Sequence, residues 1–436
     1  MAQPLKVGVA GMGTVGAALV AQVARQKDLL AARFGRAIEV VAVCARSRGK
    51  DRGIDLKKMK WFSDPVALAG APGIDVFVEL LGGAGDPAKA AVEAALASGK
   101  SVVTANKALL AKHGVKLAAL AEKHGAALNF EAAIGGAIPV VKTLREGLAG
   151  NSVDRIYGIL NGTCNYILTK MEQDKMPFAE CLKEAQRLGY AEADPTFDIE
   201  GHDTAQKLSI LASLAFGTKV DERAIYVEGI SSIASADLIA ADELGYRVKL
   251  LGVAVRTPKG IEQRVHPTMV RKDSSIAQVM GVTNAVPIDA EGINPLTLVG
   301  PGAGGAATAS AVLSDIADIA RGLRVTPFGR PTARLTSVKK APMQRHEGGY
   351  YIRLLARDKP GTAARIATRL AQQEISLESI VQRHAKGAAE ETKDGSVPVI
   401  LVTYATSEDH VRKALAAVGR DKVISGRPQV IRIEKN

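Results

Sequence analysis

Short apolar runs alternate with helical patterns along the first 150 residues of the chain. We expect strands at residues 5–10, 38–44, 75–80, 101–104 and 127–130. Between these runs, apolar residues recur every three or four positions, which is typical of helices that pack on a sheet by one face. Strands that alternate with helices form parallel sheets, so the pattern predicts an α/β fold with ligands bound beyond the carboxyl ends of the strands.

The pattern becomes mixed after residue 140 and changes again near residue 350. We expect strands near 157–163, 246–256, 285–289 and 296–299, and a long helix that starts in 300–305 and ends near 321. Residues 350–434 follow the order strand, helix, strand, strand, helix, strand, which predicts a ferredoxin-like module. The expected domains are 1–139 with a returning segment at about 300–325, a mixed α/β domain at 140–325, a linker at 326–348, and the module at 349–436.

Composition narrows the classes of protein to consider. The 436 residues are 47% hydrophobic and carry a net charge of +12, but Lys and Arg are scattered and aromatic residues are only 4%, so we expect no nucleic-acid binding. No apolar run reaches about 18 residues and no cleavage pattern follows the first one, so neither a membrane span nor a secretory signal is expected. Cys44, Cys164 and Cys181 show no paired spacing, which favours buried free thiols and a cytoplasmic location.

Three glycines separate the first strand from the first helix. Gly11 permits a tight turn, Gly13 lets the backbone approach a pyrophosphate, and Gly16 allows the helix to pack closely on the strand. The amides of Thr14 and Val15 at the start of the helix would then face the phosphates. This position of the motif predicts a Rossmann-type dinucleotide-binding domain; a glycine-rich turn without a ligand is the alternative.

The second strand is followed by Arg46 and Arg48 rather than by an acidic residue. At this position Asp or Glu usually meets the ribose of NAD, whereas arginine pairs with the 2′-phosphate of NADP. We therefore expect NADP(H) to be preferred, with use of NAD(H) left open. The alternative is that both arginines are ordinary surface residues.

One helix carries an acid and a lysine on its apolar side. Asp203 and Lys207 lie one turn apart, on the stripe that Leu211 and Leu214 continue. Buried charges are costly unless something uses them, so the pair indicates a site, although a structural ion pair would give the same pattern. The neighbouring His202 is expected to point about 100° away around the helix and to lie outside that site.

Further polar residues follow other strands at the edge where ligands gather. Thr104 and Lys107 follow the fourth strand, so Lys107 can reach the nicotinamide side of the crevice unless it is merely an exposed lysine. Glu131 begins a segment of small residues whose backbone carbonyls can turn toward a cation or a substrate. The acidic loop 188–198 leads to Asp203, and several carboxylates near a lysine suit a substrate with a positive amino group.

Six segments together resemble the homoserine dehydrogenase family. They are Gly11–Gly16, Thr104–Lys107, Phe130–Ala132, Asn161–Thr163, Gly189–Pro195 and Asp203–Leu208. The resemblance covers essentially the whole chain, and the last two segments are its most family-specific parts. The C-terminal module resembles the ACT domain of many bacterial members. Since no kinase-like segment precedes the first strand, the monofunctional form is expected.

The resemblance implies a reaction and roles for side chains. The reaction is the reversible reduction of L-aspartate 4-semialdehyde to L-homoserine, which serves the biosynthesis of threonine, methionine and isoleucine. Lys207 would deliver the proton, and Lys107 would hold the substrate and polarise the reaction centre. The implied substrate ligands are Glu192 and Asp203, with Thr163 and Asp198 as further candidates. A turn residue is the alternative for Asp198.

The resemblance also implies backbone contacts and regulation. Cofactor contacts fall on Gly189, Gly302 and Gly304, in addition to Thr104 and Lys107. A monovalent cation, expected to be sodium, would be held by the backbone around Glu131, Ile134, Gly136 and Ile138. The expected inhibitor is L-threonine, bound in the ACT module near Asp358, Pro360, Gly361 and Thr362. A homodimer is expected for the core, or a homotetramer through pairing of ACT modules.

Two other classes of protein share parts of this pattern. A 2-hydroxy-acid dehydrogenase with a regulatory domain would need a histidine paired with a carboxylate, and no histidine here stands in that context. A non-enzymatic amino-acid sensor could retain an inert nucleotide-binding fold, but the lysines at positions 107 and 207 argue against it.

Overall fold

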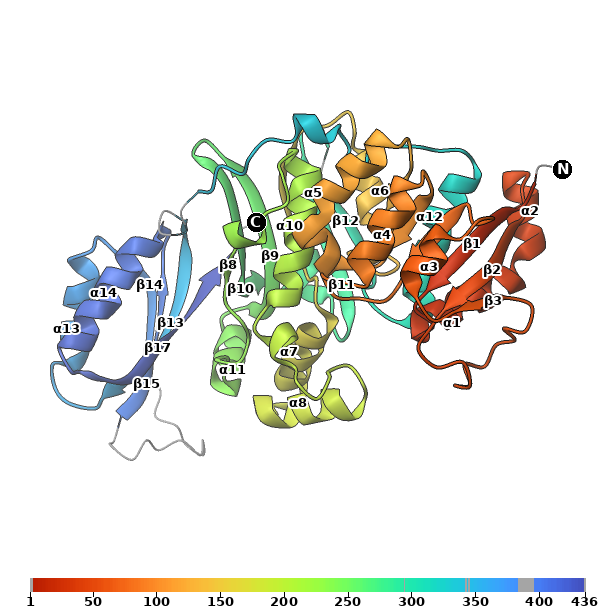
Figure 1. Ribbon diagram of the computed structural model, residues 1–436. Coiled ribbons are helices and arrows are strands. Elements are labelled where there is room, and N and C mark those ends of the chain that lie inside the picture. Colours follow the sequence, from red (N-terminus) through yellow and green to blue (C-terminus); the bar gives the residue numbers. More distant parts are fainter. Residues whose placement is uncertain (1–2, 294, 342, 344–345, 383–395, 435–436) are drawn as a thin grey trace.

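A computed structural model describes residues 3–434 of the chain, except 294, 342, 344–345 and 383–395. Three parts follow one another in Figure 1, from the red and orange N-terminal part through the green central part to the blue C-terminal part. Within the described ranges, no helix is long and apolar enough to cross a membrane. All three cysteines are buried as free thiols, as expected.

The N-terminal part is a parallel sheet of six strands. Their order is β3 (Lys60–Phe62), β2 (Ile38–Cys44), β1 (Leu5–Ala10), β4 (Val76–Glu79), β5 (Ser101–Thr104) and β6 (Leu128–Asn129). The helices are α1 (Thr14–Arg25), α2 (Lys27–Phe34), α3 (Pro65–Gly70), α4 (Ala88–Ala97), α5 (Lys107–Lys123) and α12 (Gly305–Ala320). Successive residues of β4 enter different cores: Val76 and Val78 join the cluster with α1 and α12, and Phe77 joins the one with α3, α4 and α5. The predicted α/β fold is confirmed.

The central part is built on a larger sheet. Its strands are β12 (Leu296–Pro301), β11 (Thr283–Ala290), β7 (Val153–Gly158), β9 (Tyr246–Thr257) and β10 (Gly260–Arg271), with β8 (Tyr226–Val227) beside β10. Its helices are α7 (Gly162–Asp174), α8 (Phe178–Arg187), α9 (Thr196–Ile199), α10 (His202–Phe216) and α11 (Ser235–Glu243). The sequence pattern missed β10, because its buried polar residues, among them Arg264 and His266, hide the alternation of apolar and polar positions.

Short helical turns connect these elements. They are η1 (Glu131–Ala133), α6 (Val140–Lys142), the π-turn η2 (Thr143–Gly147), η3 (Glu222–Ala224), η4 (Ser275–Gln278) and η5 (Thr332–Arg334). The strand expected at 157–163 begins earlier, at Val153, and α7 already starts at Gly162.

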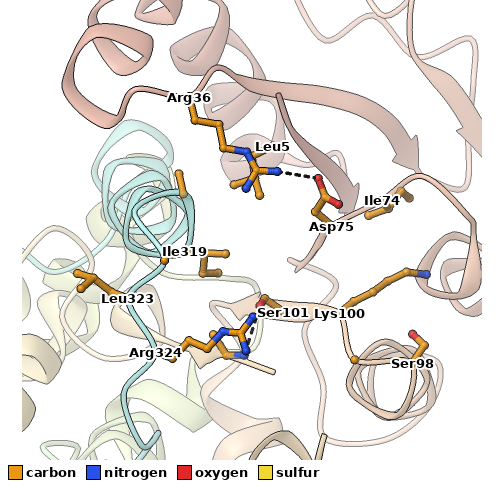
Figure 2. A pocket seen from close by; sticks show the side chains of 14 residues that line it. Leu5, Arg36, Ile74, Asp75, Ser98, Lys100, Ser101, Ile319, Leu323 and Arg324 are labelled. Atoms are coloured by element: carbon orange, nitrogen blue, oxygen red, sulfur yellow. Dashed lines mark hydrogen bonds and ion pairs between the residues drawn. The ribbon is translucent and has the colours of Figure 1, made fainter. Parts of the chain in front are cut away.

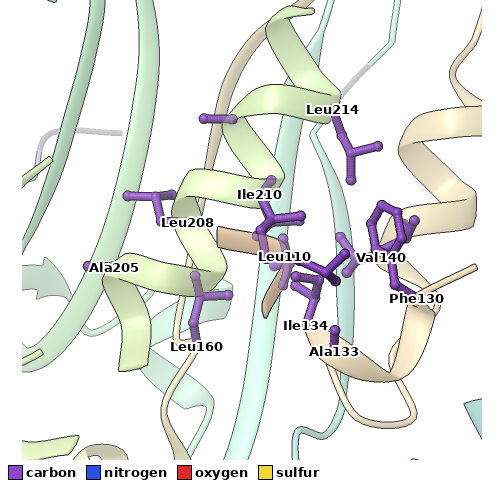
Figure 3. Close-up of a cluster of buried hydrophobic side chains, with 14 of the residues drawn as sticks. Leu110, Phe130, Ala133, Ile134, Val140, Leu160, Ala205, Leu208, Ile210 and Leu214 are labelled. Carbon is purple, nitrogen blue, oxygen red and sulfur yellow. The ribbon is translucent and has the colours of Figure 1, made fainter. Parts of the chain in front are cut away.

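Helix α10 lies at the junction of the N-terminal and central parts. Figure 3 shows Ala205 and Leu208 on one side of the helix, and Ile210 facing Leu110 of α5. Leu214 lies toward Phe130 in the same view, and all these side chains are buried. Because α10 is buried on several sides, its polar residues Asp203 and Lys207 are held at a domain junction.

The C-terminal part has the predicted βαββαβ order. Its elements are β13 (Glu347–Arg357), α13 (Thr362–Ala371), β14 (Leu377–Gln382), β15 (Ser396–Thr403), β16 (Thr406–Ser407), α14 (Glu408–Arg420) and β17 (Ile424–Ile433). Its sheet is continuous with the central sheet, because β17 pairs in parallel with β10 at Thr268–Arg432 and Met269–Ile433. The sequence did not predict this continuity.

One cavity of about 490 Å³ lies at the wrong end of the N-terminal sheet for a cofactor. Figure 2 shows its lining, in which Arg36 and Asp75 form an ion pair of 3.5 Å. Leu5 and Ser101, which also line it, begin β1 and β5. Ligands of parallel α/β sheets bind beyond the opposite, carboxyl ends of the strands, so this cavity is not the candidate site.

Candidate active site

The predicted pair on α10 is buried and in direct contact. The Lys207 ammonium donates to Asp203 Oδ2 at 2.9 Å and to the Leu160 carbonyl at 2.7 Å. Asp203 is 4% exposed. The helix begins just after Gly201, whose φ of +83° allows the chain to turn tightly into it. The charged pair is therefore held within the first two turns of α10.

A second lysine reaches the same carboxylate from the N-terminal part. Lys107, the first residue of α5, places its Nζ 3.2 Å from Asp203 Oδ1. Burial raises the pKa of the Asp203 carboxyl, but the charges of Lys207 and Lys107 outweigh it and hold that pKa at about 2. The trio of two ammonium groups and one carboxylate carries a net positive charge. It can therefore stabilise negative charge that develops on a bound molecule.

Asn161 links two acids of the site, a role that the sequence did not reveal. Its side-chain amide donates to Asp198 Oδ1 at 2.9 Å and to Asp203 Oδ2 at 2.8 Å. Its side-chain oxygen accepts from the Cys164 amide and so caps α7. Burial and the neighbouring charge of Asp203 raise the pKa of Asp198. The two acids thus sit in one pocket with opposite pKa shifts.

The residues predicted in and beside the acidic loop 188–198 differ in how firmly hydrogen bonds hold them. Thr163 Oγ donates to the Tyr190 carbonyl at 2.6 Å, which ties α7 to the loop. Gly189 has a φ of +76° and open space where a side chain would stand. Glu192 is exposed, and in the described part of the chain its side chain makes no hydrogen bond or ion pair that would fix it. His202 is exposed, with its ring 6.1 Å from that of Phe197, away from Asp203 as expected.

The glycine-rich loop has the shape that its sequence suggested. Gly11 has a φ of +104°, and a Cβ there would lie 2.4 Å from the Leu80 carbonyl oxygen. A Cβ at Gly16 would lie 2.1 Å from the Gly11 carbonyl oxygen, so only glycine lets α1 start this close to β1. Gly13 has no heavy atom within 4 Å of its Cβ position. The loop is thus closed on its inner side and open where a pyrophosphate would lie.

A second glycine-rich loop, between β12 and α12, packs against the first. A Cβ at Gly305 would lie 2.7 Å from the Thr14 methyl group. Gly304 has a φ of +113° and open space beside it, whereas a Cβ at Gly302 would meet the Asn284 side chain at 2.0 Å. The two loops, nearly 300 residues apart in sequence, form one edge of the nucleotide crevice.

Arginine side chains gather near the end of β2. Arg46 and Arg48 are exposed, and Arg48 lines a cavity of about 270 Å³ together with Lys57 and Trp61. Arg52, which the sequence did not single out, donates from Nε to the Met12 carbonyl at 3.0 Å and lies 5.5 Å from the Trp61 ring centre. It therefore joins the glycine-rich loop to this basic cavity.

Known families match most of the chain. The description "Homoserine dehydrogenase, NAD binding domain" matches residues 11–131, "Homoserine dehydrogenase" matches 139–317, and "ACT domain" matches 350–420. A homoserine dehydrogenase of Neisseria gonorrhoeae is 44% identical over 422 residues, which are 95% of each protein. The chain belongs to the homoserine dehydrogenase family. It is thereby an NAD(P)-dependent oxidoreductase that acts on a CH–OH group, and the resemblance and its ACT module are confirmed.

Other homoserine dehydrogenases match all or most of the chain. The protein of Pseudomonas aeruginosa is 44% identical over 440 residues, which are 99% of each chain. The crystal structure of the Thiobacillus denitrificans protein superposes with a TM-score of 0.92, at 40% identity, covering 99% of this chain and 98% of that one. A hyperthermophilic archaeal homoserine dehydrogenase in complex with NADPH has a TM-score of 0.63, at 27% identity, and covers 74% of this chain.

The loop expected to hold a cation offers backbone carbonyls rather than side chains. The Glu131 carboxylate is buried and accepts from the amides of Val141 and Lys142, at 2.8 and 2.9 Å. Within the described ranges the carbonyls of Ile134 and Gly136 accept no backbone hydrogen bond, whereas those of Glu131 and Ile138 accept one each, at 3.4 and 2.8 Å. Carbonyl oxygens suit hard cations such as sodium, so the donor set fits the group that the family resemblance implies.

Glu79 is a second residue that sequence reasoning missed. It ends β4, is fully buried, and accepts from the amide of Leu81 at 2.7 Å and from the hydroxyl of Thr104 at 2.6 Å. It also accepts from Asn106, the N-cap of α5, at 3.4 Å. A carboxylate at the end of an apolar strand was the available signal. Glu79 fixes the turn that presents Lys107.

The predicted effector loop joins β13 to α13. Gly361 has a φ of +88° and begins the helix, and the Thr362 amide donates to the Lys359 carbonyl at 3.2 Å. Pro360 is exposed, and Thr362 is buried beneath the loop. The loop therefore has a fixed shape of its own and lies outside the Asp203 site.

Proposed function

We propose that this family member catalyses the reversible reduction of L-aspartate 4-semialdehyde to L-homoserine, and so serves threonine, methionine and isoleucine biosynthesis. The observation that carries the proposal is the contact of Lys107 and Lys207 with the two oxygens of Asp203. Bound NADPH supplies the hydride for the aldehyde carbon. Lys207 then donates a proton to the oxygen that becomes the alcohol, while Lys107 stabilises its negative charge. Asp203, Glu192, Asp198 and Thr163 bind the polar groups of the substrate.

The experiment that tests this assignment uses Lys207→Ala, with Lys207→Arg as a second variant. Lys207 donates the proton in reduction and accepts it in oxidation, so its removal should lower kcat for L-homoserine oxidation by about 100-fold or more, as general acid–base catalysis typically contributes that much. NADPH binding, followed by fluorescence titration, should stay within twofold of the wild type. A Lys207→Ala enzyme with wild-type kcat would refute the role of Lys207.

The proposal includes a preference for NADP(H), with NAD(H) as a weaker cofactor. It is supported by the exposed Arg46 and Arg48 beside the basic cavity, and by the NADPH complex of the archaeal relative. Arg48→Ala should raise the KM for NADPH while leaving that for NADH unchanged, because only NADPH carries the 2′-phosphate. Equal effects on both cofactors would contradict the assignment.

Further parts of the proposal concern the cation, the effector and the assembly. Sodium would be held by the carbonyls of Glu131, Ile134, Gly136 and Ile138, which should make activity depend on added Na⁺.

L-Threonine would inhibit by binding near Asp358 and Thr362, so Thr362→Val should lose inhibition and keep kcat. We also propose a cytoplasmic homodimer or homotetramer; sedimentation equilibrium distinguishes the two.

A further inference from the structure

Arg52 lies between two loops at the carboxyl edge of the N-terminal sheet. One is the glycine-rich loop between β1 and α1, and the other is the loop 45–59 between β2 and β3. Because β1 and β2 are parallel neighbours in the sheet (Figure 1), both loops leave it at the same edge. Arg52 is half-buried and lines the basic cavity of about 270 Å³.

The Arg52 guanidinium donates hydrogen bonds to both loops. Its Nε donates to the carbonyl of Met12, in the glycine-rich loop, at 3.0 Å. Its Nη1 donates to the Lys50 carbonyl at 2.7 Å and its Nη2 to the Ser47 carbonyl at 2.6 Å, both in the loop after β2. The guanidinium carbon also lies 5.5 Å from the centre of the Trp61 ring. Three acceptors on two loops are thus held by one planar group, which suits the fixed fork of an arginine.

The bond to Met12 fixes the orientation of one peptide group in the glycine-rich loop. The Met12 carbonyl and the Gly13 amide belong to the same trans peptide, so this N–H points away from the oxygen that Arg52 holds. Glycine permits many backbone conformations, and without this bond the peptide could rotate. Within the described ranges the Gly13 amide donates no backbone hydrogen bond, and the space beside Gly13 is open. The amide is therefore available to a phosphate.

The loop after β2 depends on the same side chain. Within residues 54–59, three apolar side chains pack against the core that α1 and α12 share, and they anchor the second half of the loop. The first half carries the exposed Arg46 and Arg48 on either side of Ser47, whose carbonyl accepts from Arg52. Arg52 therefore holds the backbone from which both exposed arginines project.

We propose that Arg52 is a positioning residue for the cofactor. It orients the Met12–Gly13 peptide for the pyrophosphate and holds Arg46 and Arg48 in place for the 2′-phosphate, so this inference rests on the NADP(H) preference proposed above. Its own three nitrogens already donate to carbonyls, which leaves direct phosphate contact to the two exposed arginines. Because Arg52 acts on both loops, its loss should weaken the binding of NADPH and NADH, and that of NADPH more.

The test is isothermal titration of the full-length protein with NADPH and with NADH, in the absence of substrate. Arg52→Lys keeps the positive charge, but one ammonium group cannot reach carbonyls on both loops. NADPH binding should weaken about tenfold or more, because at least one hydrogen bond from a charged donor is lost. NADH binding should weaken by a smaller factor, since NADH has no 2′-phosphate to lose contacts.

A second variant leaves Arg52 in place and removes the ring beside it. Trp61→Leu takes away the aromatic face near the guanidinium, so Arg52 keeps its charge but is held less firmly. The affinities for NADPH and NADH should both fall, by smaller factors than in Arg52→Lys. This variant tests the positioning role without changing any charged group.

Arg36→Lys is the matched control. Arg36 also donates from its Nε to a backbone carbonyl, that of Gln3 at 2.6 Å, but it lines the cavity at the amino end of the sheet. Urea unfolding should show a loss of stability in both Arg36→Lys and Arg52→Lys. The affinity for NADPH should stay within about twofold of the wild type in Arg36→Lys alone, which separates positioning of the cofactor loops from general destabilisation.

Two results would overturn the proposal. One is wild-type affinity for NADPH in Arg52→Lys. The other is a loss confined to NADPH, with NADH binding unchanged, which would make Arg52 a direct ligand of the 2′-phosphate. Because no substrate is present, a failure of the proposed reaction would not alter these outcomes. A wild type that binds both cofactors equally would refute the NADP(H) preference, and the effect of Arg52→Lys on both affinities would still decide the role of Arg52.

Discussion

The side-chain amide of Asn161 donates a hydrogen bond of 2.8 Å to Asp203, 42 positions further along the chain. The same amide group donates to Asp198, and the Asn161 oxygen caps α7. One side chain therefore holds both acids of the pocket and the start of a helix. Its role in the site is positional, since it acts through Asp198 and Asp203.

Replacing Asn161 by Asp should lower kcat/KM for L-homoserine by about 10- to 100-fold. The variant keeps an oxygen for the helix cap but removes the amide that donates to the two acids, which is worth about 1.5–3 kcal/mol for a charged acceptor. Asn161→Ala should in addition lose about 1 kcal/mol of stability with the cap. Steady-state kinetics and urea unfolding measure both effects. Asn151→Asp is the control, because the half-buried Asn151 donates to the Glu291 carbonyl and contacts neither acid of the site. Wild-type kinetics in Asn161→Asp would disprove the role.

The sequence predicted the relationship between site residues that lie on a single helix, but not the contacts between different elements. Asp203 and Lys207 are four residues apart on one helix, so their shared face followed from helical spacing. The contact of Lys107 with Asp203 could not follow from spacing, because it depends on how α5 packs on α10. Glu79 was hidden for a similar reason, since its hydrogen-bond donors come from the turn after β4, the end of β5 and the N-cap of α5.

The strands were predictable where alternation or a continuous apolar run was visible. The expected ranges of β1, β2 and β5 match the structure, whereas β10 was missed because its buried face carries paired polar groups such as Arg264 and His266. The union of the ACT sheet with the central sheet rests on the register of β17 beside β10. Register between strands so distant in sequence leaves no local signal.

Acid should remove the stability that Asp203 contributes. Its pKa is about 2 in the folded protein, below the value of about 3.9 in an unfolded chain, so its contribution is complete above that unfolded value and is lost as the pH falls toward 2. The contribution at neutral pH is on the order of 2 kcal/mol. Urea unfolding at several pH values should show wild type and Asp203→Asn converging as the pH drops from 6 to 3. A gap that stays constant over this range would contradict the lowered pKa.

Asp198→Asn should show the opposite trend and serves as the control. The pKa of Asp198 is raised by burial and by Asp203, so its ionised form destabilises the fold and the penalty disappears on protonation. Acidification should therefore stabilise the wild type relative to Asp198→Asn. The stability difference between wild type and variant should therefore change with pH in opposite directions for the two variants. Because both carboxylates accept from the Asn161 amide, this contrast distinguishes an effect of the site from general acid unfolding.

Gly136→Ala should impair both the cation loop and the cofactor loop. Gly136 has a φ of +58°, and a Cβ there would lie 2.6 Å from the Gly302 carbonyl group, so the backbone must move. We expect a higher KM for NADPH and a higher Na⁺ requirement, beyond the roughly 1–2 kcal/mol of strain in a left-handed residue. Gly73→Ala is the matched control, because Gly73 also has a positive φ but open space around it. Gly73→Ala should lose stability only. If both variants showed the same KM for NADPH and the same Na⁺ requirement, the coupling between the two loops would be disproved.

Glu79→Gln should slow catalysis although Glu79 lies behind the crevice. The substitution keeps the volume but replaces one acceptor oxygen by a donor, so the Leu81 amide and the Thr104 hydroxyl can no longer both donate to this side chain. The start of α5, which carries Lys107, is then held less firmly. Because one hydrogen bond to a charged group is lost, kcat/KM should fall about tenfold. Glu122→Gln offers a matched control, because Glu122 accepts from the Thr332 amide and hydroxyl near the far end of the same helix. Both variants should unfold at lower urea, but only Glu79→Gln should change kcat/KM; matching kinetics in the two would mean that Glu79 has a structural role alone.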